Sequence, residues 1–222
     1  MKINYIIATW NGSRVKPNVD MVYYESVLKN HIKQLGRLKN HINKITIMRP
    51  RSSVKNNYYK IDLNSNIKIV DCKNEYQSYG QWLIALEKFI DDYDYHILIE
   101  DDYVPACDNF DEKLITLYEE GTYLCSLVGE DKSANLPFHC RISNGIISSN
   151  TIRNLIKNIE YLNWFKTGDV PQIQFSKLLI DNGISLVDYS SKYIVEYYAL
   201  GTITNYGLES GEKIFTPIQK QF

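Results

Sequence analysis

Residues 95–103 read Tyr-His-Ile-Leu-Ile-Glu-Asp-Asp-Tyr, an apolar run that ends in three consecutive acids. An uninterrupted apolar run of this length predicts a β-strand that is buried on both faces, as in a parallel sheet. Side chains alternate along a strand, so we expect Glu100 and Asp102 on one side and Asp101 on the other. Because the acids follow the run directly, they are placed at the carboxyl end of the predicted strand.

Strand-like and helix-like segments alternate on both sides of this run. Short apolar segments predict strands at residues 4–9, 44–48, 66–70, 123–128, 142–148 and 184–187. Apolar residues at helical spacing predict helices at residues 20–35, 79–93, 111–118, 150–159 and 171–182. Asp108 or Asn109 is the expected cap of the third helix. The alternation is typical of an α/β domain with a mixed, mostly parallel central sheet flanked by helices. The sequence after Tyr198 shows no pattern that we assign.

The composition is that of a globular protein. Of the 222 residues, 44% are hydrophobic and 23% are charged, which excludes a disordered chain and favours one domain over residues 1–222. A net charge of −1 gives no general attraction to polyanions, so nucleic-acid binding is not expected. No apolar run approaches the roughly 20 residues of a membrane-spanning helix. We therefore expect a cytoplasmic protein without a membrane span.

Three adjacent carboxylates at a strand end need a cation or hydrogen-bond donors beside them, because they repel one another and lose hydration when buried. Mg²⁺ and Mn²⁺ prefer oxygen ligands of this kind and complete their shells with water and substrate phosphates. Open α/β sheets bind ligands at the carboxyl ends of their strands. We therefore interpret Glu100, Asp101 and Asp102 as part of a cation-dependent substrate site. The competing interpretation is a solvated acidic turn that caps the next helix.

The first two predicted strand ends carry candidates for binding an anionic ligand. After the first strand, Thr9 offers a polar contact, Trp10 suits stacking on a base, and Arg14 suits a phosphate. Arg49 follows the second strand and is suited to a diphosphate or a base edge. The alternatives left open are core packing for Trp10 and a solvated basic loop for Arg49.

Three later segments add weaker candidates. Ser78 and Gln81 open a predicted helix whose N-terminal amides favour an anion, as in many loops between a strand and a helix. Gly145 interrupts a strand-like run, which marks a bulge, close backbone approach to a ligand, or a plain edge strand. Asp169 precedes another helix and is either its cap or a general base at the edge of a site.

The order of these segments resembles that of GT-A glycosyltransferases. The resemblance covers roughly residues 3–190 and rests on four stretches: NYIIATWNG, ILIEDDY in the place of an Asp-x-Asp motif, ISNGIISSNTIRNLI, and TGDVPQIQFSKLLIDNGISLVDY. The composition, rich in Tyr, Ile, Asn and Lys, resembles that of glycosyltransferases encoded by large DNA viruses that modify their own capsid proteins. The resemblance implies a GT-A, Rossmann-like domain that transfers a sugar from a nucleotide diphosphate, with a UDP-sugar favoured, to a glycan or glycoprotein hydroxyl.

The resemblance also implies roles for individual residues. Residues 1–105 form the donor-binding half and residues 106–222 the acceptor half. Asp102 is the expected ligand of Mn²⁺ or Mg²⁺, whereas Glu100 and Asp101 contact the metal, the ribose or the sugar. Glu in the first place of the acidic triplet departs from the family pattern and leaves direct metal ligation by Glu100 open. Asp169 is the candidate base of an inverting reaction. The remaining donor-binding candidates are Thr9, Trp10, Arg14, Arg49, Ser78 and Gln81.

Two other classes of protein remain open. A sugar nucleotidyltransferase also needs acids and Mg²⁺ on an α/β sheet, but it typically has a Gly-rich basic turn after the first strand. Here that turn has one Gly and one Arg, Gly12 and Arg14. A non-catalytic carbohydrate-binding module would use some of the 18 tyrosines as sugar platforms and would need neither metal nor nucleotide.

Overall fold

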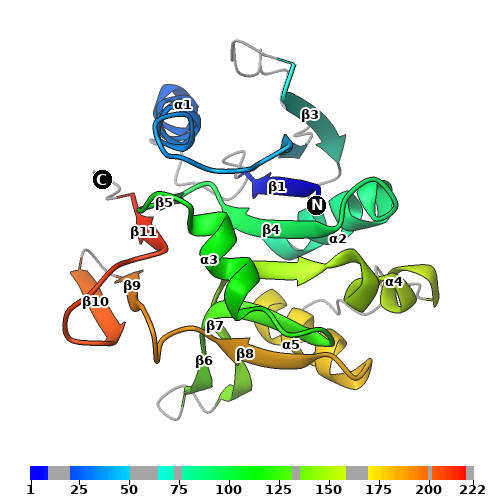
Figure 1. Ribbon diagram of the computed structural model, residues 1–222. Helices are drawn as coiled ribbons and strands as arrows, with labels where there is room; N and C mark the ends of the chain where they lie inside the picture. The colour runs from blue at the N-terminus through cyan, green and yellow to red at the C-terminus, as the bar shows by residue number, and fades with distance from the viewer. Residues whose placement is uncertain are drawn as a thin grey trace.

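A seven-stranded mixed sheet forms the centre of the computed structural model, which describes residues 1–9, 21–50, 65–72, 77–131, 136–158, 170–199 and 202–218 (Figure 1). The strand order is β3-β2-β1-β4-β7-β6-β8. The strands are β1 (Ile3–Ala8), β2 (Lys44–Pro50), β3 (Ile67–Cys72), β4 (Tyr95–Glu100), β6 (Thr122–Asp131), β7 (Leu136–Ser148) and β8 (Ser185–Asp188). Of these, β7 runs antiparallel to its neighbours β4 and β6, and the other pairs are parallel. The predicted mixed, mostly parallel sheet is confirmed.

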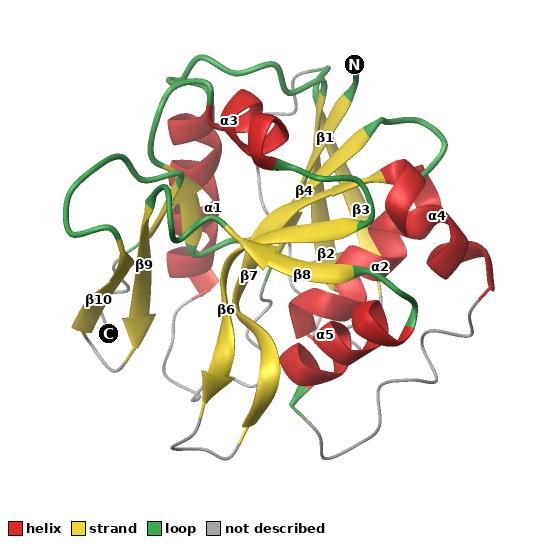
Figure 2. Ribbon diagram, turned by 60° about the horizontal axis from the view of Figure 1, so that its bottom comes forward, coloured by secondary structure: helices red, strands yellow, loops and turns green. Residues whose placement is uncertain are grey.

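Helices cover both faces of the sheet, as the alternating sequence pattern predicts (Figures 1 and 2). On one face, α2 (Gln77–Phe89), α4 (Ser149–Asn158) and α5 (Pro171–Asp181) share a core that contains Trp82, Ile152 and Phe175. On the other face, α1 (Met21–Leu35) and α3 (Phe110–Leu117) share a second core that contains Leu28 and Phe110. No helix in the described part of the chain has both the length and the apolar character needed to cross a membrane.

The apolar run in β4 is buried on both faces because its residues alternate between these two cores. Leu98 lies in the core under α2, whereas Ile97 and Ile99 lie in the core under α1 and α3. The central position of β4 explains this burial, since β1 pairs along one edge and β7 along the other. By the same alternation, Glu100 continues the side of Leu98 and faces α2.

The strand order places a reversal point between β1 and β4. From β1 the chain passes to β2 and β3 on one side of the sheet, then returns to β4 on the other side of β1. The crossover connections that leave β1 and enter β4 therefore lead to opposite sides of β1 in the sheet. Such reversal points are where open α/β sheets bind ligands.

The part of the chain after residue 188 forms two small antiparallel sheets. Strand β9 (Ile194–Ala199) pairs with β10 (Thr202–Gly207), and β11 (Phe215–Pro217) pairs with β5 (Tyr103–Pro105), directly after the acids (Figure 1). The sequence did not predict these strands because β5 and β11 span three residues each and the described face of β10 is largely exposed. The last strand in the described part of the chain is thus joined to the segment that directly follows the acids.

Gly145 lies in β7 at the centre of the sheet, not on a plain edge strand. A Cβ at this position would lie 2.1 Å from the carbonyl oxygen of Leu124 and 2.7 Å from Cα of Cys125, both in β6. The β6–β7 register shifts next to this contact, between Cys125 and Leu127, which marks a bulge. The glycine is therefore needed for close approach of two strands.

Candidate functional site

A pocket of about 270 Å³ opens at the carboxyl end of β4. Its walls come from the turn after β4, from β7, from the start of α5 and from β9. The lining residues are Gln77, Tyr79, Glu100, Asp102, Tyr103, Arg141, Ile142, Ser143, Val170, Pro171, Gln172, Tyr197 and Tyr198. We call this cavity the acid pocket, since Glu100 and Asp102 are its two described carboxylates.

Glu100 is held in a fixed position at the edge of the acid pocket. Ser78, in the first turn of α2, donates a hydrogen bond of 2.5 Å from Oγ to Oε1 of Glu100. The Glu100 backbone N–H donates to Oδ1 of Asn144 in β7, at 2.9 Å. Ser78 and Glu100, both predicted from the sequence as donor-binding residues, therefore meet in the folded chain.

Asp102 lines the acid pocket and Asp101 does not, as the alternation of side chains along a strand predicts. Asp101 is only 7% exposed and does not line the acid pocket, and its backbone N–H donates to the carbonyl oxygen of Ala8 at 3.0 Å. Asp102 does line the pocket, and its carbonyl oxygen accepts from the N–H of Ile218 at 2.6 Å. Both backbone groups tie the acidic turn to neighbouring segments, so its conformation is set by the fold.

A buried histidine supports the turn from the opposite face of the sheet. His31 in α1 lies 3.3 Å from the Asp101 carbonyl oxygen through Nδ1 and 2.8 Å from the Tyr5 hydroxyl through Nε2. A carbonyl only accepts, so Nδ1 carries the proton and Nε2 accepts from Tyr5. Burial lowers the pKa of His31 to about 4, more than the hydrogen bond to Asp101 raises it. His31 is therefore neutral at pH 7 and acts as a support for the turn.

Two of the tyrosines that line the acid pocket, Tyr79 and Tyr103, keep their hydroxyls protonated because their pKa values are raised. Burial, followed by the charges of Asp102 and Glu100, raises the pKa of Tyr103 far above its ordinary value. Burial and the charge of Glu100 likewise raise the pKa of Tyr79, whose hydroxyl lies 2.9 Å from Oγ of Ser143. These groups offer neutral hydrogen-bonding and stacking surfaces beside two carboxylates.

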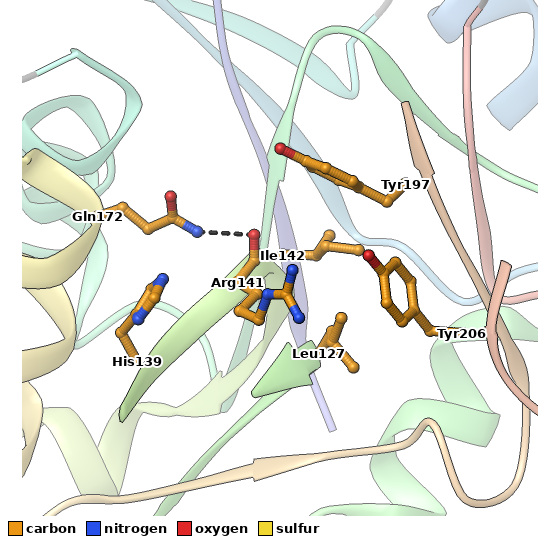
Figure 3. Close-up of a pocket in the computed structure, with 7 residues that line it drawn as sticks. All are labelled: Leu127, His139, Arg141, Ile142, Gln172, Tyr197 and Tyr206. Atoms are coloured by element: carbon orange, nitrogen blue, oxygen red, sulfur yellow. Dashed lines mark hydrogen bonds between the residues drawn. The ribbon is translucent and has the colours of Figure 1, made fainter. Parts of the chain in front are cut away.

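A second cavity of about 180 Å³ adjoins the acid pocket and shares Arg141, Ile142, Gln172 and Tyr197 with it. Its other lining residues are Leu127, His139 and Tyr206 (Figure 3). Figure 3 shows the Arg141 side chain reaching between Leu127 and the two tyrosines, with Gln172 and His139 on the opposite side of β7. We call this cavity the arginine pocket.

Other predicted donor-binding residues have structural partners. Gln81 is 1% exposed; its Oε1 accepts from the Thr9 N–H at 3.0 Å, and its Nε2 donates to the Thr9 carbonyl at 2.9 Å. The Thr9 hydroxyl donates to the Met48 carbonyl at 2.7 Å. Neither Gln81 nor Thr9 lines the acid pocket. The pair holds the end of β1 against α2 and β2.

Arg49 is likewise not among the residues that line the acid pocket. Its Nε donates to Oδ1 of Asp71 at 2.6 Å, which joins the ends of β2 and β3. Three further residues predicted from the sequence lie outside the described residues: Trp10 and Arg14 for donor binding, and Asp169 for base catalysis.

The chemistry of the acid pocket fits a hard divalent cation that keeps most of its shell from water and substrate. Within the described ranges, no three His, Cys, Asp or Glu side chains cluster as metal ligands. Two carboxylates, Glu100 and Asp102, border one cavity. Mg²⁺ and Mn²⁺ use one or two carboxylates in this way when phosphate oxygens supply further ligands.

Several pocket residues were not anticipated from the sequence. Arg141, Gln172, Tyr197 and Tyr206 come from β7, α5, β9 and β10, and the fold alone brings them together. The tyrosine-rich stretch near residue 197 was the available signal, but without the β9–β10 pairing nothing connected it to the acids.

Comparisons with known proteins show the fold. No family model matches the chain, and no curated protein matches it. A protein from Bacillus anthracis assigned as a glucose-1-phosphate thymidylyltransferase, solved with sucrose, has a TM-score of 0.52 at 12% identity, covering 85% of this chain and 87% of its own. The 4-diphosphocytidyl-2C-methyl-D-erythritol synthase of Anaerococcus prevotii has a TM-score of 0.49 at 15% identity, covering 84% of this chain and 86% of its own.

Neither of these two structures carries the name of a glycosyltransferase. At 12% identity, the likeness to the thymidylyltransferase extends to the architecture and not to the activity. Together with the observed sheet, it establishes that this chain has an α/β, Rossmann-like fold with a mixed, mostly parallel sheet.

Proposed function

We propose that the chain is a transferase that acts on a nucleotide sugar, with the sugar-diphosphate end of that molecule in the acid pocket. The observation that carries the proposal is the placement of Glu100 and Asp102 on one cavity at the carboxyl end of the central strand β4. Buried strand ends seldom present two carboxylates to a cavity unless a cation or donor compensates them. The tyrosines of the same pocket suit the sugar ring.

The cation in this proposal is Mn²⁺ or Mg²⁺, held by Asp102 with Glu100 beside it. When bound, such an ion neutralises negative charge on a diphosphate leaving group. Ser78 fixes the Glu100 carboxylate, and the Asp101 backbone bond to Ala8 fixes the turn, so the two acids need little rearrangement to receive it. This preorganisation favours a site for charge stabilisation.

The first candidate reaction is glycosyl transfer. The bond between the sugar's anomeric carbon and the diphosphate oxygen breaks, and the acceptor hydroxyl oxygen bonds to that carbon. The acceptor proton passes to a carboxylate base, for which Asp169 is the candidate. Asp169 precedes Val170 and Pro171, which both line the acid pocket. A glycan or glycoprotein is the expected acceptor, because the resemblance of the sequence to glycosyltransferases implies an acceptor of this kind.

The second candidate reaction is sugar nucleotidyl transfer, and the likeness to the thymidylyltransferase favours it over the first. Here an oxygen of a sugar phosphate bonds to the α-phosphorus of a nucleoside triphosphate, and pyrophosphate leaves. The reaction needs the same fold and the same kind of acid-bound cation. It would use the turn after β1, where Gly12 and Arg14 lie in the sequence.

Product analysis separates the two reactions. The purified chain is incubated with Mn²⁺ and a panel of nucleotide sugars, and separately with nucleoside triphosphates and sugar 1-phosphates. Release of nucleoside diphosphate from the first set supports glycosyl transfer, whereas pyrophosphate from the second supports nucleotidyl transfer. Asp102→Asn, which keeps the side-chain shape, should abolish either product. Sugar binding without any product and without a metal requirement would instead indicate a non-catalytic carbohydrate-binding module.

A further inference from the structure

The arginine pocket adjoins the acid pocket, so a molecule in one lies near a molecule in the other. Four residues, among them Arg141 and Tyr197, line both cavities. A transferase needs two substrates side by side, with the second reaching the reacting atoms of the first. The arrangement of the two cavities meets this requirement.

Arg141 is held in place from three directions. Its carbonyl oxygen accepts from Nε2 of Gln172 at 2.7 Å, which fixes the backbone (Figure 3). Its guanidinium carbon lies 5.4 Å from the centre of the Tyr206 ring, a cation–π distance. Gly129 in β6 leaves room for its stem, since a Cβ at Gly129 would lie 3.2 Å from Cδ of Arg141. A side chain positioned in this way loses little freedom when it binds an anion.

The charge of Arg141 is directed into the cavity and not into an internal ion pair. Among the described residues, the arginines that form ion pairs are Arg49 with Asp71 and Arg153 with Asp91. Arg141 contacts a tyrosine ring instead, and its fork of donors is suited to two oxygens of one carboxylate or phosphate. The two tyrosines beside it, Tyr197 and Tyr206, give apolar ring surface on which a sugar can pack.

We propose that the arginine pocket binds the second substrate, and that this substrate is a sugar that carries a carboxylate or a phosphate monoester. The anionic group pairs with Arg141, while the sugar ring packs on Tyr197 and Tyr206. This inference rests on the proposed transferase function and names the class of its second substrate. In glycosyl transfer the anion selects an acidic acceptor, and in nucleotidyl transfer it is the attacking sugar phosphate.

Direct binding tests the proposal. Calorimetry measures the affinity of the folded chain for methyl glucuronide, for glucose 1-phosphate and for the neutral reference methyl glucoside. We expect at least one anionic sugar to bind more tightly than methyl glucoside, and Arg141→Gln to weaken that binding by about 10- to 100-fold. Preference for the glucuronide identifies a carboxylate ligand, and preference for the sugar phosphate identifies a phosphate ligand. Arg37→Gln, at an exposed arginine after α1, is the matched control and should change nothing.

A second titration separates this inference from the proposed function. Nucleotide with Mn²⁺ should bind Arg141→Gln as it binds the unmodified chain, and Asp102→Asn should lose the nucleotide but keep the anionic sugar. Equal affinity for charged and neutral sugars, or a loss of nucleotide binding with unchanged sugar binding in Arg141→Gln, would overturn the inference. Absence of nucleotide binding in the unmodified chain, with Arg141-dependent sugar binding intact, would overturn the proposed transferase and leave the anion site standing.

Discussion

Gln81 shows how a single side chain can be structural although its position suggests a ligand contact. Its amide matches both backbone groups of Thr9, one bond of 3.0 Å and one of 2.9 Å. The amide is buried, so no water replaces it when it is removed. From the sequence, Gln81 could only be placed at the start of a helix, where a ligand contact and a backbone contact look alike.

Replacing Gln81 by Leu should therefore reduce stability before it changes binding. The substitution leaves the N–H and carbonyl of Thr9 buried without partners, which costs about 1–3 kcal/mol for such a loss. Urea unfolding followed by circular dichroism measures the change. Gln34→Leu, at a half-exposed residue of α1, is the control and should change the free energy of unfolding by less than about 0.5 kcal/mol. Equal stability of the Gln81 variant and the unmodified chain would show that the Thr9 pairing is not needed.

At the scale of elements, the close packing of β6 and β7 depends on Gly145. In Gly145→Ala, the new Cβ would meet the Leu124 backbone at 2.1 Å, and neither strand can give way without disturbing the sheet. We expect a loss of at least about 1–3 kcal/mol, measured by thermal and urea unfolding. Gly36→Ala is the control, because a Cβ there would have an ordinary contact at 3.5 Å with the Ile32 carbonyl. Similar effects of the two substitutions would contradict this account of β7.

Elements that combine length with a regular apolar pattern were predictable, and short or exposed elements were not. The run at residues 95–99 appears as β4, and the spacing at residues 20–35 appears as α1, within one residue at each end. The third helix begins after Asn109 as expected, but Asn109 adopts a left-handed conformation with φ 54° and makes no side-chain cap bond. Asp108 instead accepts from the Lys39 N–H at 2.9 Å, a partner from a distant segment that local sequence cannot indicate.

A clamp that ties β9 to the segment around β11 was equally hidden, because Glu196 meets partners that lie 17 and 20 residues further along the chain. Glu196 in β9 accepts from Nζ of Lys213 at 2.6 Å and from Oγ1 of Thr216 at 2.5 Å. Burial raises the pKa of Glu196, but these hydrogen bonds and the charge of Lys213 together lower it by more than burial raises it. The pKa of Glu196 therefore lies below its ordinary value. The clamp holds the strand that carries Tyr197 and Tyr198 over the pocket.

This lowered pKa predicts a stability change with pH. The ionised Glu196 stabilises the fold at pH values above its ordinary pKa of 4.5, and that contribution is lost as the pH falls through the lowered folded pKa. Glu196→Gln should thus cost about 1–2 kcal/mol at pH 7 and progressively less below pH about 4. Urea unfolding at several pH values tests this, with the exposed Glu209→Gln as control. A stability difference that grows toward low pH would have the wrong sign.

At the scale of the whole molecule, the end of the described chain supports the acids near its middle. Strand β11 pairs with β5, and Ile218 donates to the carbonyl of Asp102. Phe215 in β11 is 3% exposed and packs in the core beneath α1 and α3. The sequence showed the acids and the fold around them, but the covering strands and the arginine pocket arise from contacts between distant segments.

Phe215→Ala should lower both the stability of the fold and the affinity for nucleotide, because β11 supports the acidic turn. Removing a buried phenylalanine costs about 3–5 kcal/mol, and the change should also weaken nucleotide binding, because β11 no longer braces the turn after β4. Thermal unfolding and calorimetry measure the two effects. Leu208→Ala, at a residue that is 40% exposed, is the control and should leave both unchanged. If the Phe215→Ala variant is less stable but still binds nucleotide with unchanged affinity below its melting temperature, β11 does not support the site.

Calorimetric titration of UDP and other nucleoside diphosphates, with and without Mn²⁺, tests whether Glu100 and Asp102 bind a nucleotide sugar through a divalent ion. We expect that one nucleotide binds the unmodified chain in the presence of Mn²⁺, that chelation of the ion weakens binding by at least about 10-fold, and that Asp102→Asn abolishes the metal dependence. Nucleotide affinity that is the same with Mn²⁺, after chelation and in Asp102→Asn would contradict this expectation.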